Sequence, residues 1–262
     1  MTEWRIVRKI KRAILQDEPT YYDMFENPGE RFFGRIYLHL ICNALRAHGP
    51  TPPLELLDAG CQSGRLAIPL AKEGHSVTGV DTSGVGLHRA RRHAAEQGVK
   101  LELVRADLAR WLPRCPEASF DVVLCAEVLY LRPNFQTLLK ELIRVLRPGG
   151  LCFIAHRATA FYLAEAFQRR DWDAVRTALS KKEGTLFGSY YNWQDREDLE
   201  PLYRSLGVNL LEIRPIGFFS WQTVKPDELD APQQELLFQA EVDPRTLHER
   251  SSRYLLAIGR KQ

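Results

Sequence analysis

The sequence predicts an α/β protein built on a mostly parallel β-sheet with helices on both faces. An apolar run at residues 54–57 ends in a glycine turn, a helical pattern follows, and a second strand from Ser76 to Val80 delivers Asp81. Further apolar strand patterns alternate with helical patterns, at residues 101–104, 120–125 and 151–155. This alternation is typical of βαβ units, and therefore of a parallel sheet that is buried on both faces.

Length and composition are those of a globular protein. The 262 residues carry a net charge of +3, which is too small an excess to indicate nucleic-acid binding. The five cysteines show no CxxC spacing, which indicates reduced structural thiols in a cytoplasmic protein rather than disulfides or metal ligands. No apolar run reaches membrane-spanning length, and the basic N-terminus lacks the apolar core of a signal peptide.

The turn from Asp58 to Gly64 has the chemistry of a nucleoside-binding site. Gly60 and Gly64 let the backbone turn tightly and approach a ligand where a Cβ would collide. Asp81, at the tip of the neighbouring strand, can accept hydrogen bonds from ribose hydroxyls. Asp58 stands two positions before the first glycine, where its carboxylate would repel a pyrophosphate but attract a cationic amino group. The pattern therefore points away from a dinucleotide.

The segment Asp58-Ala59-Gly60-Cys61-Gln62-Ser63-Gly64 resembles motif I of class I S-adenosylmethionine-dependent methyltransferases. The run VLRPGG at residues 145–150, directly before a strand, resembles a frequent companion of that motif. The resemblance implies a Rossmann-like, seven-stranded sheet, S-adenosylmethionine as the cofactor and no metal. Gln62 departs from the pattern because the family usually has its central glycine there. If that position needs a positive φ, Gln62 is strained by roughly 1–3 kcal/mol.

The resemblance also implies a set of cofactor contacts. After the third strand, Arg105-Ala106-Asp107-Leu108 resembles the segment in which these enzymes hold adenine, with a carboxylate on the exocyclic amine and an apolar side chain on the ring. N-terminal helices of the family commonly fold over the cofactor cleft and contribute a Tyr or an Arg. The expected cofactor-binding residues are Asp58, Gly60, Cys61, Gly64, Asp81, Thr82, Ala106, Asp107, Leu108, Ala126, Tyr22 and Arg31.

Two candidate catalytic residues follow neighbouring strands. Residues 120–125 run into Ala126-Glu127-Val128-Leu129-Tyr130, and in the resembling family the end of this strand lies beside the transferable methyl group. The AEVLY sequence is also similar to nodulation-type N-methyltransferases. Glu127 is a candidate for binding a substrate amine or hydroxyl, or else a helix-start carboxylate favoured by the dipole. His156 is either a proton acceptor or a hydrogen-bonded structural histidine.

We expect an N-terminal helical cap at residues 1–53 and a methyltransferase domain at residues 54–262, with a lid insertion at about 157–197. Residues 1–15 form a basic amphipathic pattern, which fits a helix on an anionic membrane surface or a solvated cap helix. A turn-rich, aromatic stretch then precedes a helix expected at 36–47. The lid aromatics form either an acceptor pocket or a small core. The candidate acceptor contacts are Tyr130, Tyr190, Tyr191 and Trp193.

The predicted activity is transfer of the S-adenosylmethionine methyl group to an O, N, S or C atom of a small-molecule acceptor. Much of the catalysis would come from holding the nucleophile in line with the methyl carbon. One alternative is an RNA or protein methyltransferase. Against nucleic acid, the chain has no (D/N)-P-P-(Y/F) signature after the fourth strand and no basic stripe beyond the N-terminus. The other alternative is a non-catalytic S-adenosylmethionine-binding protein whose site Gln62 weakens.

Overall fold

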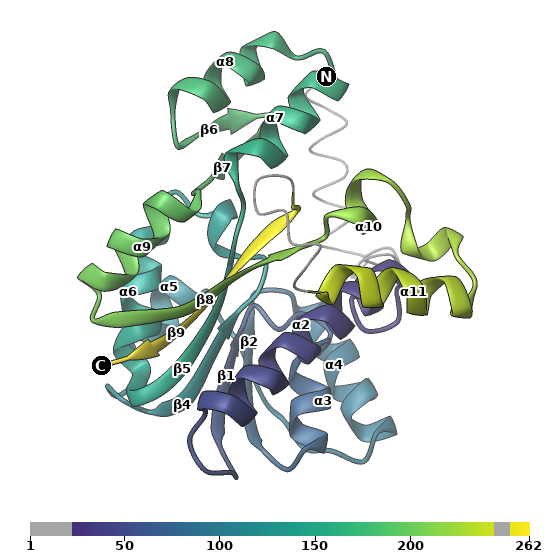
Figure 1. Ribbon diagram of the computed structural model, residues 1–262. Helices are drawn as coiled ribbons and strands as arrows, with labels where there is room; N and C mark the ends of the chain where they lie inside the picture. Colours follow the sequence, from purple (N-terminus) through teal and green to yellow (C-terminus); the bar gives the residue numbers. More distant parts are fainter. Residues whose placement is uncertain (1–22, 244–251) are drawn as a thin grey trace.

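The protein has the mostly parallel central sheet that the sequence predicts. A computed structural model describes residues 23–243 and 252–262 (Figure 1). Seven strands lie in the order β3-β2-β1-β4-β5-β9-β8; β1 to β5 pair in parallel, and β9 is antiparallel to both of its neighbours. The strands are β1 (Glu55–Ala59), β2 (Ser76–Asp81), β3 (Glu102–Arg105), β4 (Phe120–Cys125), β5 (Leu146–His156), β8 (Val208–Ile216) and β9 (Tyr254–Lys261).

Helices cover both faces of this sheet, which confirms the predicted fold class (Figure 1). Neighbouring strand residues point to opposite faces, so Leu56 belongs to one hydrophobic cluster and Leu57 to the other. The first cluster includes residues of α2, α3 and α11, and the second includes residues of α5, α6 and α9. The helices around the sheet are α2 (Pro28–His48), α3 (Ala67–Lys72), α4 (Gly84–Glu96), α5 (Leu108–Trp111), α6 (Phe135–Val145), α9 (Arg196–Ser205), α10 (Phe219–Gln222) and α11 (Ala231–Val242), with 3-10 turns η2 (Leu112–Arg114), η3 (Leu129–Leu131) and η4 (Pro226–Glu228).

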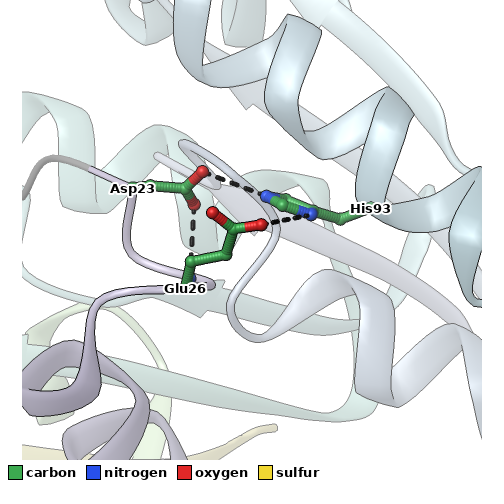
Figure 2. A group of neighbouring side chains, drawn as sticks. All are labelled: Asp23, Glu26 and His93. Atoms are coloured by element: carbon green, nitrogen blue, oxygen red, sulfur yellow. Dashed lines mark hydrogen bonds and ion pairs between the residues drawn. The ribbon is translucent and has the colours of Figure 1, made fainter. Parts of the chain in front are cut away.

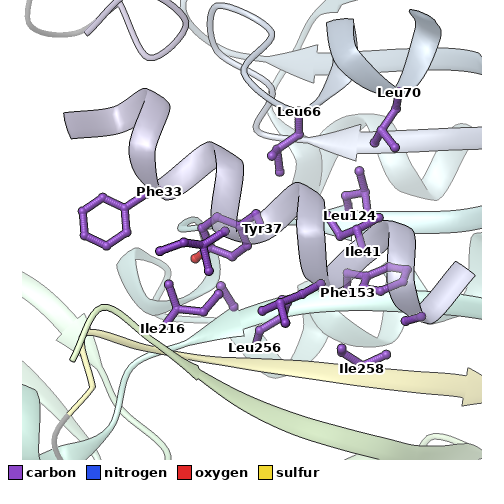
Figure 3. Close-up of a cluster of buried hydrophobic side chains, with 14 of the residues drawn as sticks. Phe33, Tyr37, Ile41, Leu66, Leu70, Leu124, Phe153, Ile216, Leu256 and Ile258 are labelled. Atoms are coloured by element: carbon purple, nitrogen blue, oxygen red, sulfur yellow. The ribbon is translucent and has the colours of Figure 1, made fainter. Parts of the chain in front are cut away.

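Helix α2 begins earlier than the sequence analysis expected. The Asn27 side chain accepts a hydrogen bond from the backbone N–H of Glu30, and Pro28 occupies the first turn, so this stretch starts a helix rather than a series of turns. Its buried face, which includes Tyr37 and Ile41, packs on the sheet beside Phe153 and Leu256 (Figure 3). The described part of the predicted cap therefore shares its core with the sheet, and the boundary near residue 53 stays a prediction.

The predicted lid segment forms a small unit of its own. It consists of α7 (Thr159–Gln168), α8 (Trp172–Ser180) and an antiparallel hairpin of β6 (Glu183–Leu186) and β7 (Ser189–Asn192), which the sequence analysis did not identify as strands. Figure 1 shows these elements beyond the carboxyl end of β5. A separate hydrophobic cluster that includes Tyr162 and the fully buried Trp193 holds them together. Whether this unit acts as a lid stays a prediction.

Two of the sequence predictions fall outside the described residues. The basic amphipathic pattern of residues 1–15 and the candidate cofactor contact Tyr22 both belong to residues 1–22. Within residues 23–243 and 252–262, none of the helices has the length and apolar character needed to cross a membrane. All five cysteines are free thiols, as the sequence analysis expected.

Candidate functional site

The glycine turn leads from β1 to α3 at the carboxyl edge of the sheet and is hydrogen-bonded to β2. Gly60 has a φ of +95° and Gly64 a φ of +88°, values that favour glycine. A Cβ on Gly60 would collide with the side chain of Val128, and the Gly60 N–H donates to the carbonyl of Val80 at 2.7 Å. Val128 therefore packs against the Gly60 backbone too closely for a larger residue at this position.

Asp81 fixes the turn from the tip of β2. Its Oδ2 accepts a hydrogen bond from the Gln62 N–H at 3.0 Å, and its Oδ1 accepts one from the Ser83 N–H at 2.7 Å. Gln62 has a φ of +44°, so the position where the family usually has glycine does adopt the left-handed backbone. Each carboxylate oxygen has a second lone pair, which leaves Asp81 able to accept from a ribose hydroxyl as well.

A pocket of about 250 Å³ opens at this edge of the sheet. Five of the expected cofactor residues line it, and so does the expected catalytic residue Glu127. The sequence analysis did not predict Val80, Val128, Leu131 and Arg132 as site residues, because single apolar or basic residues in strands and loops carry no distinctive signal. The lining residues are Gly60, Val80, Asp81, Thr82, Ala106, Leu108, Glu127, Val128, Leu131 and Arg132.

Asp58 lies buried at the end of β1, and its exposed fraction is only 3%. Burial raises the pKa of this carboxyl to about 7, and the nearby Asp81 adds to the rise while Arg65 opposes it. The backbone N–H of Ala67 donates to the carboxylate. Asp58 is therefore partly protonated near neutral pH, and a cationic group brought near it would favour its charged form.

Other expected cofactor residues lie next to the pocket rather than in its lining. Asp107 caps α5 by accepting from the Ala109 N–H, and its second oxygen pairs with Arg132, a lining residue, at 2.6 Å. The Cys61 side chain lies against Gly79 of β2. Gly64 packs on Ile68, and Ala126 packs on the core cluster of the first sheet face. Their direct contact with the cofactor stays a prediction.

Glu127 is the centre of a buried network of charges. Its backbone has a φ of +63°, and its exposed side-chain fraction is 8%. Arg65 donates to Oε1 of Glu127 at 2.8 Å and, from its other nitrogen, to Glu30 at 2.5 Å; the Tyr254 hydroxyl donates to Oε2 of Glu127 at 2.6 Å. Burial raises the pKa of Glu127, but Arg65, Arg253 and the Tyr254 hydroxyl hold it below its usual range. Glu127 is therefore an ionised carboxylate in the pocket wall.

His156 closes β5 in a different environment. It is fully buried, with Nδ1 3.1 Å from the Gln194 side-chain oxygen and Nε2 2.8 Å from the Tyr203 hydroxyl. Burial lowers the pKa of His156 to about 4, against the hydrogen bond with Gln194. Both ring nitrogens have partners, and His156 does not belong to the lining of the 250 Å³ pocket. Its role as a proton acceptor stays a prediction.

The predicted acceptor contacts take different positions. Trp193 is fully buried, and its indole N–H donates to the Lys181 carbonyl at 2.8 Å. The Tyr190 hydroxyl donates to Glu183 at 2.6 Å, and the half-buried Tyr191 packs on Tyr162 at 5.2 Å between ring centres.

Tyr130, the predicted acceptor contact outside the lid, accepts a hydrogen bond from Arg157 at 3.2 Å, next to Glu127. Arg31 lies exposed on α2 and outside the pocket lining. The structure thus places Tyr130 nearer to the pocket wall than the lid aromatics.

A second group of titratable side chains ties the start of the described chain to α4. The ligand-type atoms of Asp23, Glu26 and His93 lie within 4.8 Å of one another (Figure 2). Asp23 is 3.0 Å from Nε2 of His93, while Arg92 is 3.1 Å from Glu26 and Arg89 is 3.7 Å from Asp23. Two guanidinium groups already neutralise these carboxylates, so the group fits an ion-pair network. Whether the reaction needs a metal is not tested by this group, so a metal-free reaction stays a prediction.

Comparisons with known proteins agree with this geometry. Residues 56–150 match a family model described as a methyltransferase domain. The ubiquinone biosynthesis O-methyltransferase of Maricaulis maris is 39% identical over 129 residues, which is 47% of this chain and 50% of that protein. The chain spans about half the length of the curated relatives it matches.

Two solved structures share the fold over almost the whole chain. One is the 1,6-didemethyltoxoflavin-N1-methyltransferase of Burkholderia thailandensis, with a TM-score of 0.59, 18% identity, and coverage of 100% of this chain and 91% of that one. It contains bound 1,6-didemethyltoxoflavin and S-adenosylhomocysteine. The other is the magnesium protoporphyrin IX methyltransferase of Synechocystis, with a TM-score of 0.60, 16% identity, and coverage of 98% and 99%.

The parallel sheet, the glycine turn and the acidic residue at the tip of β2 define a Rossmann-like domain with a nucleoside-type pocket at its carboxyl edge. The matched segment carries that turn, that acid and the VLRPGG run. Residues 56–150 thus form a methyltransferase domain, in agreement with the resemblance of the turn sequence to class I S-adenosylmethionine-dependent methyltransferases.

Proposed function

We propose that this protein transfers the methyl group of S-adenosylmethionine to a nucleophilic atom of a small-molecule acceptor. The observation that carries the proposal is the pocket in which Gly60, Asp81 and Glu127 meet at the ends of β1, β2 and β4. A Cβ at Gly60 would collide with Val128, another lining residue, and the pocket combines two carboxylates with apolar walls. That donor set fits a cofactor with a ribose, an ammonium group and no phosphate.

Each part of the pocket has a role in holding the cofactor. Asp81 accepts from the ribose hydroxyls, and Val80, Leu108 and Leu131 give apolar surface for the adenine ring. Asp58 provides negative charge for the cationic amino group. When bound, the cofactor supplies a methyl group that is activated by a sulfonium, and the leaving group is a neutral thioether. The protein then has to hold the acceptor in line and exclude water.

Glu127 is the group best placed to act on the acceptor. It lines the pocket, and its ion pair with Arg65 and its hydrogen bond from Tyr254 fix the position of its carboxylate. An ionised carboxylate can hold an acceptor amine or hydroxyl and take up the proton that it releases. His156, neutral at pH 7, is the alternative proton acceptor, but its reach to an acceptor would require the Gln194 or Tyr203 contact to open.

The small-molecule acceptor class has independent support. The named relatives include an O-methyltransferase of ubiquinone biosynthesis and an N-methyltransferase of a toxoflavin precursor, so related proteins act on O or N atoms of small molecules. The five free cysteines support a cytoplasmic location. An RNA or protein acceptor, and a non-catalytic cofactor-binding role, are the alternatives that the experiment below and an acceptor screen would detect.

Calorimetric titration with S-adenosylmethionine, S-adenosylhomocysteine and NAD tests the proposal. We expect binding of the two sulfur nucleosides and none of NAD. Asp81→Ala should weaken that binding roughly tenfold to a hundredfold, because it removes a charged acceptor for the ribose and two hydrogen bonds of the turn. Asp173→Ala is the matched control, because Asp173 is an exposed carboxylate on α8. If neither sulfur nucleoside binds the wild-type protein, the proposal is wrong.

A further inference from the structure

Arg157 lies directly after β5 with its guanidinium in an aromatic box formed by Tyr130, Phe161 and Tyr254. Its Cζ atom is 4.2 Å from the ring centre of Tyr130, 4.1 Å from that of Phe161 and 4.9 Å from that of Tyr254. One nitrogen donates to the hydroxyl of Tyr130 at 3.2 Å and to that of Tyr254 at 3.1 Å. These neutral oxygens and ring faces hold the cation, but they do not neutralise it.

The lack of a counter-ion distinguishes Arg157 from other arginines of the structure. Arg65, Arg132, Arg144 and Arg169 each lie within 2.9 Å of a carboxylate oxygen. Within residues 23–243 and 252–262, no carboxylate pairs with Arg157, and its buried Nε has no hydrogen-bond partner. A buried charge normally has a paired charge of opposite sign, because leaving water costs several kcal/mol per ion. The aromatic box is therefore electrostatically incomplete.

A second arginine lies on the same aromatic ring. The guanidinium of Arg253 lies 5.1 Å from the ring centre of Tyr254, so two positive groups share one aromatic ring. Glu127 does not pair directly with Arg157, because the Tyr254 hydroxyl lies between them, donating to Glu127 and accepting from Arg157. The site is arranged to attract an anion that the described chain does not supply.

The position of the aromatic box shows what kind of anion would reach it. On one side, Tyr254 connects Arg157 to Glu127, which lines the cofactor pocket. On the other side, Phe161 belongs to α7 of the predicted lid. Arg157 thus lies between a residue that lines the cofactor pocket and α7 of the predicted lid. It does not contribute to the lining of the cofactor pocket, which argues against the cofactor's own carboxylate as the missing anion.

We propose that Arg157 binds a carboxylate group of the methyl acceptor, and that the acceptor is an aromatic acid whose ring packs against the aromatic box. This inference rests on the proposed methyl transfer, and it names the acceptor class. A guanidinium forms charge-assisted hydrogen bonds with a carboxylate, and Nη1 of Arg157 has no hydrogen-bond partner among the described residues, whereas Nη2 donates to both tyrosines. Arg157 is then a specificity-determining residue that sets the distance between the acceptor ring and Glu127.

Matched acceptor pairs test the assignment. Calorimetry in the presence of S-adenosylhomocysteine compares 4-hydroxybenzoate with 4-hydroxybenzamide, and 4-aminobenzoate with 4-aminobenzamide, in which only the charge of one substituent changes. We expect the wild-type protein to bind at least one acid roughly tenfold to a hundredfold more tightly than its amide. Arg157→Met should remove this preference without changing amide binding, and Arg157→Lys should keep part of it.

Controls separate specificity from folding and from cofactor binding. Arg169→Met removes another arginine that lies on a ring, 4.5 Å from the centre of Phe187, and should leave the preference intact. Equal affinity for acid and amide in every pair, or no binding of any acid, overturns the inference. So does weaker S-adenosylhomocysteine binding by a folded Arg157→Met, because the cofactor would then be the anion. Failure of the proposed function is distinguishable, since it appears as loss of cofactor binding in the wild-type protein.

Discussion

Two buried polar regions lie at the carboxyl ends of adjacent strands, and they differ in charge and in backbone geometry. At the end of β4, Glu127 forms an ion pair with Arg65 in the pocket wall. At the end of β5, His156 forms only neutral hydrogen bonds, with Gln194 and Tyr203. The first region is charged and faces the pocket, whereas the second is uncharged and fully enclosed.

The backbone shows the same contrast. Glu127 of the first region and Gln62 of the glycine turn have positive φ angles of 63° and 44°, whereas His156 continues a regular strand. Such conformations cost of order 1–3 kcal/mol each and persist where the surroundings impose them, commonly at functional sites. The difference teaches that a residue's place at a strand end does not define its role. Its partners and its backbone strain separate a ligand site from a structural network.

The largest expected effect comes from breaking the ion pairs of the first region. Arg65→Met leaves the buried carboxylates of Glu30 and Glu127 without their shared cation. We expect a loss of about 3–5 kcal/mol in the free energy of unfolding, measured by urea denaturation. Arg65→Lys should recover part of it, because the charge remains but the two-sided geometry does not.

An exposed ion pair provides the control for the stability lost in Arg65→Met. Arg176 pairs with Asp173 on α8, where both side chains are mostly exposed, so Arg176→Met should change the unfolding free energy by less than about 0.5 kcal/mol. If Arg65→Met costs no more than Arg176→Met, the network around Glu127 does not hold the site, and the contrast between the two regions fails.

The second region should show itself as a pH dependence of stability. The folded-state pKa of His156 is lowered by burial to about 4, below an ordinary value of about 6.5. Between these two values the unfolded chain binds a proton at His156 and the folded protein does not. The free energy of unfolding therefore decreases as the pH falls from about 6.5 towards 4. Between pH 8 and pH 5 this loss is about 2 kcal/mol.

The variant His156→Gln isolates this contribution. It has no titrating group at this position, so the difference in unfolding free energy between wild-type and variant should shrink by about 2 kcal/mol from pH 8 to pH 5. A constant difference across that range would mean that His156 is not held neutral. It would then support the alternative that His156 is accessible to solvent and acts as a proton acceptor.

The local part of the site could be predicted from the sequence. The order of strand, turn, helix and strand predicts Gly60 and Asp81, and the resemblance of the segment after the third strand implies Leu108; all three line the pocket. Such residues depend on neighbours a few positions away, so a pattern along the chain places them. The fold class could be predicted in the same way, because each buried strand and amphipathic helix has its own period.

The long-range part could not be predicted. Glu127 contacts Tyr254, 127 residues further on, and Arg65 contacts Glu30, 35 residues earlier. Arg65 and Arg157 looked like ordinary basic residues, because their significance comes from burial and from the presence or lack of a carboxylate beside them. The start of α2 was missed for a local reason, since an Asn27-Pro28 cap within an aromatic stretch has the composition of a turn.

The smallest expected effect tests the backbone strain at Gln62 in the glycine turn. Gln62→Gly relieves a φ of +44°, at the cost of the side-chain oxygen that accepts from the Ser63 N–H. We expect the protein to gain up to about 1 kcal/mol in unfolding free energy. Gln136→Gly, on the exposed face of α6, should instead lose about 1 kcal/mol of unfolding free energy, because its backbone is helical.

Calorimetry with S-adenosylhomocysteine then shows whether the strain at Gln62 affects cofactor binding. Unchanged affinity means that Asp81 already holds the turn in its binding form, whereas a tenfold or larger gain would favour the non-catalytic reading in which Gln62 weakens the site.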